Sequence, residues 1–108
     1  MLKIDGNKIW LTRGDSATLK LTVNDSSGAE YDYSQDTVVF TVKRSWAESD
    51  ALITKTVNAD GEIVLDAADT ADLQAGRYVY DVQITSDKGA VDTVIPYTEF
   101  VLCADVSN

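Results

Sequence analysis

The amino-acid sequence predicts an all-β protein, an antiparallel sandwich of about seven to eight short strands. Short runs in which apolar and polar residues alternate recur along the chain, and each run is followed by a cluster of turn-forming residues. No long stretch has the 3.6-residue periodicity of an amphipathic helix. The clearest alternation, over residues 77–85, begins just after a glycine that closes a polar turn, which is typical of strands in a sandwich.

The first expected strand spans residues 8–12. Ile9 and Leu11 take one phase of its alternation, and Trp10 takes the other. If the two aliphatic side chains face the core, Trp10 points outward. Residues 13–16 then form a turn in which glycine supplies permissive backbone angles.

That turn, Arg13-Gly14-Asp15-Ser16, matches a tetrapeptide through which proteins bind integrins. A match this short arises easily by chance, and a turn capped by Asp15 or Ser16 explains it. We therefore expect a structural turn and not a cell-attachment site.

Two more strands are expected in the first half of the chain, over residues 17–23 and 37–43. Between them, residues 24–28 combine Asn, Asp, Ser and Gly, which tolerate turn geometry or bond to nearby backbone. In the second of these strands Val39 falls on the outward phase.

The middle of the chain continues with a strand of ambiguous phase over residues 51–57. Residues 58–61 end in Asp-Gly, a pair suited to positive φ, and this predicts a hairpin with residues 62–65 as the returning strand. Residues 66–75 form a corner that has room for one helical turn.

The last third holds the clear strand over residues 77–85, a hairpin turn at 87–89 and a returning strand over 90–95. Pro96 cannot donate a backbone hydrogen bond, so it predicts a bulge or a sheet edge. Residues 97–103 are the final expected strand.

Tyr78 and Tyr80 narrow the fold class. Tyr78 follows the corner, where the hydroxyl of a tyrosine-corner residue bonds back to backbone a few residues upstream. Tyr80 then takes the position at which antibody domains carry their second cysteine. Both are interpreted as scaffold, and we expect one immunoglobulin-like sandwich domain over residues 1–108.

The composition limits the classes of partner. The chain carries 18 Asp and Glu against 9 Lys and Arg, a net charge of −9. Duplex DNA and anionic membranes repel such a chain, so neither is an expected partner. The N-terminus lacks the apolar core of a signal peptide, and no apolar run approaches the length of a membrane span. Synthesis in the cytoplasm is expected.

Catalysis has little support in the sequence, and no cofactor is expected. The chain has no histidine, so its single cysteine, Cys103, lacks the partner of a usual cysteine nucleophile. A single cysteine also excludes an intrachain disulfide, and we expect Cys103 to pack as a small hydrophobic residue. The chain is therefore predicted not to be an enzyme.

Asp66, Asp69 and Asp72 stand three residues apart and would share one face of a helical turn. Hard cations such as calcium take several oxygen ligands, but this spacing is not that of an EF-hand loop. Asp66 or Asp69 as a helix cap is the favoured interpretation, and cation binding stays an open alternative.

The outward-facing apolar residues are the candidate contact site. Trp10, Val39 and Val79 all fall on the outward phase of their strands, and Trp46 lies in a loop or helical turn after residue 43. If the three strand residues adjoin, they form a protein–protein interface.

Tyr31, Tyr33 and Trp46 are aromatic residues in or near loops. Such residues bind sugar or a partner protein, or they cover the end of a sandwich. Covering the core is favoured. A carbohydrate- or cell-surface-binding module is the alternative function, with these three rings as its stacking surfaces.

The order of several motifs resembles a known family. The motifs are Ile9 to Ser16, Tyr31-Asp32-Tyr33, Val38 to Val42, Leu52-Ile53-x-Lys55, Gly61-x-Ile63 and Asp69-Thr70-x-x-Leu73-x-x-Gly76-x-Tyr78-x-Tyr80-Asp81-Val82. They resemble the small immunoglobulin-like domain of tail and baseplate proteins of phages and prophages of Gram-positive bacteria. They are similar to the N-terminal domain of upper baseplate proteins, over roughly residues 8–103.

The resemblance implies a non-enzymatic structural role in a virion, in its tail or baseplate. It implies contacts with other tail or baseplate proteins and no cofactor, and a homo-oligomer is a further possibility. In upper baseplate proteins the domain begins a longer chain, whereas this sequence stops at Asn108. The resemblance assigns no binding residues.

Overall fold

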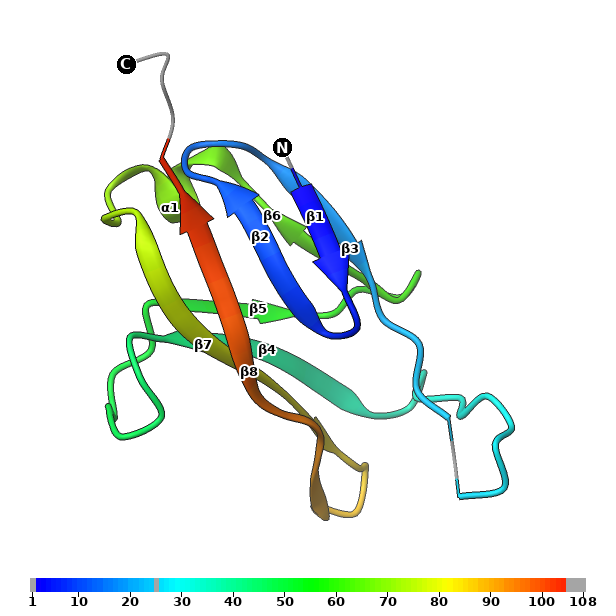
Figure 1. The fold of residues 1–108 in the computed structure, drawn as a ribbon. Helices are drawn as coiled ribbons and strands as arrows, with labels where there is room; N and C mark the ends of the chain where they lie inside the picture. The colour runs from blue at the N-terminus through cyan, green and yellow to red at the C-terminus, as the bar shows by residue number, and fades with distance from the viewer. Residues whose placement is uncertain (1, 25, 105–108) are drawn as a thin grey trace.

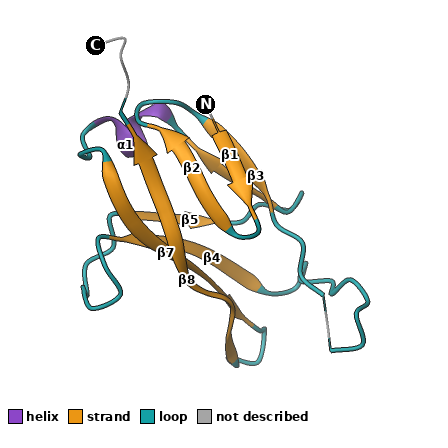
Figure 2. Cartoon of the chain, in the orientation of Figure 1, coloured by secondary structure: helices purple, strands orange, loops and turns teal. Residues whose placement is uncertain are grey.

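The structure is a computed structural model that describes residues 2–24 and 26–104 (Figure 1). Strands dominate it, and one short helix lies close to the point where the last strand ends (Figure 2). In chain order, the elements of these residues are β1 (Leu2–Asp5), β2 (Lys8–Thr12), β3 (Ala17–Lys20), β4 (Thr37–Lys43), β5 (Ile53–Thr56), β6 (Glu62–Leu65), α1 (Ala67–Ala71), β7 (Gly76–Thr85) and β8 (Val91–Cys103).

The strands form two sheets. The large sheet has six strands in the order β1-β2-β8-β7-β4-β5, and the small sheet pairs β3 with β6. The expectation of purely antiparallel pairing is wrong at one place, because β2 runs parallel to β8. These two strands lie at opposite ends of the sequence, so no tight hairpin forces them to run in opposite directions.

The alternation along the strands accounts for the core between the two sheets. In β4 and β7 every second residue is buried, and in the small sheet Leu19, Ile63 and Leu65 turn toward the large sheet. Phe40, Tyr80 and Phe100 form its aromatic centre. The rings of Phe40 and Tyr80 lie 5.2 Å apart between centroids, a separation that favours attraction between aromatic rings.

Three element predictions need correction. β1 was not expected. It exists because it pairs along its whole length with β2 through a tight turn at Gly6, whose φ is +60°. The 58–61 turn forms, but it joins strands in different sheets, because β5 pairs with β4 and β6 pairs with β3.

The third correction concerns the two strands expected on either side of Pro96, which are a single strand, β8. The register against β7 shifts between Tyr80 and Val82, and again between Val82 and Gln83. A bulge at Pro96 was expected, and the first shift lies there. Residues 91–99 of β8 pair with β7 alone, so Pro96 also lies at a sheet edge, where its missing N–H costs no ladder bond.

The corner between β6 and β7 is built as the tyrosine pattern predicts. The hydroxyl of Tyr78 donates a 2.6 Å hydrogen bond to the carbonyl of Gln74. Asp66 caps α1, and its backbone N–H donates to the carboxylate of Asp69 at 2.7 Å. No helix in the described part of the chain has the length and apolar character needed to cross a membrane.

Candidate functional site

The candidate site lies on the outer face, defined here as the face of the six-stranded sheet that turns away from the small sheet. Trp10, Val39 and Val79 all lie on this face, each between buried neighbours on its own strand, and each is half-buried. Their placement follows from the two-residue period of a strand. The sequence therefore predicted the side of the sheet for all three.

The register shows that these three residues do not form one cluster. Val39 stands opposite Gln83, whereas Val79 stands opposite Lys43, four residues farther along β4. Trp10 lies beyond β8, where its partner is Val101. The three residues therefore share a face without adjoining, because alternation sets the side of a strand and not its position within the sheet.

Two lysine ammonium groups lie near the ring of Trp10. The ammonium groups of Lys3 and Lys8 lie 4.9 Å and 4.8 Å from the centroid of its ring. Such contacts are favourable because a cation is attracted to the face of an aromatic ring. Lys8 also forms an ion pair of 2.9 Å with Glu99, and its hydrogen bond holds the pKa of Glu99 below its ordinary value.

Two aromatic residues from other segments also expose large apolar groups on this face. Trp46, in the β4–β5 loop, is 71% exposed, and Tyr97, on β8, is 62% exposed. The two rings stack with centroids 6.4 Å apart and an angle of 27° between their planes. Large rings are usually buried, so a stacked pair left in solvent is a candidate contact surface.

The pair borders a hollow of about 300 Å³ on the outer face. We call it the aromatic hollow. Besides Trp46 and Tyr97, its lining includes Thr41, Lys43, Val79, Asp81, Thr93 and Pro96. Of the four contact residues expected from the sequence, Trp46 and Val79 line this hollow, and Trp10 and Val39 do not.

The bulge in β8 shapes this hollow. Between the pairs Tyr80–Thr98 and Val82–Ile95, strand β8 has one residue more than β7. A bulge of this kind bends a strand and changes the direction of its side chains. Tyr97 was not singled out from the sequence. Pro96 was the available signal, because it marks the bulge beside Tyr97.

Tyr31 and Tyr33 belong to a different place. They precede β4, whereas Trp46 follows β4, so the three aromatic residues lie at opposite ends of that strand. Tyr33 packs against the core and donates a 2.8 Å hydrogen bond to the carbonyl of Leu21, in keeping with the favoured covering role. The hydroxyl of Tyr31 donates to the carboxylate of Asp36 at 2.6 Å. The three rings therefore do not gather at one site, because Trp46 borders one hollow and Tyr31 and Tyr33 border another.

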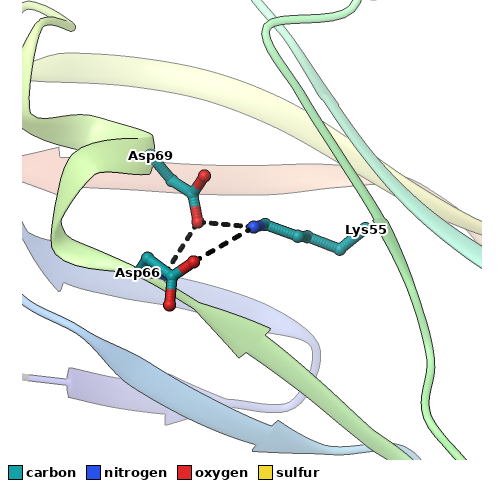
Figure 3. Close-up of polar contacts among 3 residues, drawn as sticks. All are labelled: Lys55, Asp66 and Asp69. Atoms are coloured by element: carbon teal, nitrogen blue, oxygen red, sulfur yellow. Dashed lines mark hydrogen bonds and ion pairs between the residues drawn. The ribbon is translucent and has the colours of Figure 1, made fainter.

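Two of the three aspartates, Asp66 and Asp69, pair with a lysine (Figure 3), whereas Asp72 is the C-cap residue of α1. The ammonium of Lys55, on β5, lies 2.9 Å from a carboxylate oxygen of Asp69 and 3.7 Å from one of Asp66. Burial alone would raise the pKa of Asp69, but the hydrogen bonds from Lys55 and from the Asp66 backbone outweigh it and lower that pKa. Among the residues that the structure describes, no group of acidic and cysteine side chains is arranged to hold a metal ion.

The Arg13-Gly14-Asp15-Ser16 turn packs against the corner after β6. Arg13 donates a hydrogen bond to the carbonyl of Leu73 at 3.4 Å, and the N–H of Gly14 donates to the hydroxyl of Thr70 at 2.8 Å. Thr70 is fully buried. The turn therefore ties the N-terminal strands to α1, which is a structural role.

No family model, curated protein or solved structure matches this chain. The candidate site is therefore interpreted from its own chemistry. It offers two exposed aromatic residues, the aliphatic side chain of Val79 and a few polar groups in the same lining. Surfaces of this composition bind a partner by desolvating the rings.

Proposed function

We propose that this chain is a non-enzymatic structural protein of a phage or prophage tail or baseplate, an immunoglobulin-like β-sandwich that joins neighbouring tail proteins. The resemblance of its motifs to baseplate domains supports this role and a location in the virion. The tyrosine corner and the single core between the two sheets support the immunoglobulin-like type.

The aromatic hollow is the observation that carries the proposal. Trp46 and Tyr97 are mostly exposed, and Val79 adds an aliphatic group to the lining of the same hollow. Aromatic residues near the centre of an interface contribute much of its binding energy when they are fully desolvated. A neighbouring tail or baseplate protein that seats a side chain in this hollow would desolvate both rings.

The charged groups beside the hollow would orient that partner. Lys43 and Asp81 line the hollow, and Glu99, opposite Val79 on β8, forms ion pairs with Lys8 and Arg77. Charges at the rim of an interface mainly affect the rate and specificity of association. A chain without histidine and with no expected cofactor fits a role in assembly rather than in catalysis.

The test is incorporation into particles. Phage-like particles are purified from cells in which the gene carries Trp46→Ala and Tyr97→Ala together, and the chain in them is quantified by mass spectrometry. We expect the native chain to be present at a fixed ratio to the other tail proteins and the double variant to be depleted at least tenfold, as about 1.4 kcal/mol of lost contact energy requires.

Tyr31→Ala is the matched control, since it removes a partly exposed ring at the other end of β4. This variant is expected to enter particles normally. If the native chain is absent from purified particles, or if the double variant enters them as well as the native chain does, the proposal fails.

A carbohydrate-binding module of the cell surface is the second candidate function, and the aromatic hollow is the observation that favours it. The apolar face of a sugar ring stacks on exposed aromatic rings, and Thr41, Asp81 and Thr93 surround the same hollow with hydroxyl and carboxylate groups. A panel of glycans from Gram-positive cell walls, with and without calcium, tests it. If the chain binds a glycan, and if Trp46→Ala abolishes this binding while Tyr31→Ala does not, glycan recognition replaces assembly as the proposed function.

A further inference from the structure

The outer edge of β1 is an unpaired sheet edge with exposed apolar side chains. β1 is the first strand of the large sheet, and in the described part of the chain only β2 pairs with it (Figure 1). Leu2 and Ile4 are 38% and 51% exposed. An open edge of this kind is a template for pairing with another strand.

Leu2 and Ile4 belong to the core-facing side of the sheet. Their cross-strand partners on β2 are Leu11 and Ile9, both buried, and residues opposite one another share a face. Ile4 also borders a hollow of about 120 Å³ that Ile9 and Leu19 help to line. The apolar row of the core thus continues onto β1, where the small sheet leaves it uncovered.

The hairpin register shows which backbone groups are available. A two-residue turn joins Asp5 to Lys8, so Asp5–Lys8 and Lys3–Trp10 are the hydrogen-bonded pairs of the β1–β2 ladder. The N–H and C=O groups of Leu2 and Ile4 therefore point to the open edge. An added strand would bond to these two residues.

A second copy of β1 fits this edge in one antiparallel register. Centring the two-fold axis on Ile4 places Ile4 opposite Ile4 of the second copy, as a hydrogen-bonded pair on the apolar side. The same register places Lys3 opposite Asp5 on the other side, twice by symmetry. Centring the axis on Lys3 would instead place two ammonium groups opposite each other, which is unfavourable.

We propose that the chain forms a two-fold symmetric dimer in which the β1 strands of two copies pair antiparallel about Ile4 and join the two large sheets into one. Closed two-fold dimers are the commonest symmetric assemblies, and each copy contributes the same surface. The charges of Lys3 and Asp5 would discourage pairing with an arbitrary strand, yet they complement each other in this register. The dimer would carry two aromatic hollows on one continuous sheet face.

This proposal does not rest on the proposed function, because it uses the sheet edge and not the outer face. Its first test is the mass of the purified chain in solution by analytical ultracentrifugation, from about 10 μM to about 1 mM at physiological ionic strength. We expect the mass to rise from one chain toward two, since four residues of strand make a weak contact. A mass of one chain over the whole range overturns the proposal.

The second test removes a hydrogen bond that only the dimer uses. Ile4→Pro deletes an N–H that points to the open edge, while the ladder bonds of Lys3 and Asp5 to β2 remain. Two symmetric bonds are lost, so dimerisation should weaken by about five- to a hundredfold. Near-ultraviolet circular dichroism checks that the monomer stays folded. Unchanged dimerisation of a folded variant contradicts the proposal.

The third test exchanges the charges of Lys3 and Asp5. It remains informative even if the proline in Ile4→Pro disturbs the hairpin. Lys3→Asp and Asp5→Lys each place like charges opposite one another and should weaken the dimer between about twofold and thirtyfold. The double variant restores both pairs and should dimerise like the native chain. Because Lys3→Asp also removes the contact with Trp10, recovery in the double variant isolates the pair across the interface. Single variants that dimerise normally, or a double variant that stays weak, overturn this register.

Discussion

The hydroxyl of Tyr80 donates a hydrogen bond to the backbone carbonyl of Asn7, 73 residues away in the sequence. Tyr80 lies on the central strand β7 with its ring in the core, only 4% exposed. Asn7 belongs to the turn between β1 and β2. One buried hydroxyl thus ties the N-terminal hairpin to the centre of the fold.

Tyr80→Phe should therefore loosen this hairpin more than the rest of the molecule. The ring keeps its packing, but the Asn7 carbonyl loses its donor, at a cost of about 0.5–1.5 kcal/mol in the free energy of unfolding. Urea denaturation measures the free energy of global unfolding, and amide hydrogen exchange measures the local opening of the β1–β2 hairpin. Tyr78→Phe is the control, because its bond to Gln74 is local to the corner. Unchanged exchange of the β1 amides in Tyr80→Phe would show that the hairpin is held by other contacts.

The same residue makes stability sensitive to alkaline pH. Burial raises the pKa of Tyr80 from 10.0 to about 12. A folded-state pKa above the unfolded one stabilises the protein below pH 10, and this contribution is lost as the pH rises from 10 through 12, because only the unfolded chain then releases the proton. Stability should fall by roughly 2–3 kcal/mol over this range.

Tyr80→Phe lacks this group, so its stability should fall less steeply. The native chain is the more stable of the two at pH 8, and the two stability curves are expected to cross between about pH 10 and pH 11. Other tyrosines and lysines titrate equally in both proteins. Parallel curves up to pH 12 would mean that the hydroxyl of Tyr80 is reached by solvent.

Gly61→Ala should be destabilising for two separable reasons. The φ of Gly61 is +76°, and a Cβ there would meet the hydroxyl of Tyr33 at 2.6 Å. Gly28→Ala is the matched control, because Gly28 has a φ of +87° and open space around it. Both should lose about 1–2 kcal/mol from backbone strain. Gly61→Ala should lose roughly 0.5–1.5 kcal/mol more, since Tyr33 must leave its bond to Leu21.

Thermal or urea unfolding measures the destabilisation of Gly61→Ala and Gly28→Ala. A Tyr33→Phe background separates the cost of backbone strain from the cost of the clash with the Tyr33 hydroxyl. In a Tyr33→Phe background the hydroxyl is absent, so Gly61→Ala should cost no more than Gly28→Ala does. An extra cost that persists there would place the conflict elsewhere, at Lys20 for example, whose ammonium lies 3.3 Å from the same point.

Lys55→Met should make the free energy of unfolding less dependent on pH in acid. Burial alone would raise the pKa of Asp69, but the hydrogen bond and charge of Lys55 help to lower it, so this contribution to stability is present above the ordinary pKa of 3.8 and is lost as the pH falls through the lowered value. Without Lys55 the acid dependence below about pH 4 should flatten, with a loss near neutrality of about 0.3–1 kcal/mol, because the pair is partly exposed.

Lys20→Met removes an equal charge from an exposed position and is the control, because Lys20 bonds to the Asp60 carbonyl and not to Asp69. Urea midpoints at pH 2, 3, 4 and 7 compare the variants. Equal flattening in both variants would assign the effect to net charge.

The sequence was informative wherever structure depends on close neighbours. The sides taken by Ile9, Trp10 and Leu11 follow from alternation, and the bond of Tyr78 follows from its place after the corner. Position within a sheet depends on distant partners, which alternation does not encode. The parallel β2–β8 pair and the separation of Trp10 from Val79 were therefore not predictable from local pattern.

β1 and Tyr97 were missed for related reasons. β1 has only two apolar residues, both exposed, and its Gly6-Asn7 turn was the signal available for it. Tyr97 was placed in a strand, but its exposure depends on a bulge whose register only the pairing with β7 defines. A proline inside an apolar strand thus indicates a bulge, and the side chain next to the bulge can change direction.

The stacked pair of Trp46 and Tyr97 should contribute little to folding. Both rings are more than half exposed, so Trp46→Ala and Tyr97→Ala should each lower the free energy of unfolding by less than about 1 kcal/mol. A double-mutant cycle by urea denaturation should give a coupling of about 0.5 kcal/mol, the low end for aromatic pairs. Val79 lines the same hollow and is half-buried, so Val79→Ala should cost more than the loss of either ring. Losses above about 2 kcal/mol for the rings would identify them as structural. Small losses would mean that two large rings are kept in solvent without a benefit to stability, which is the behaviour expected of a contact surface.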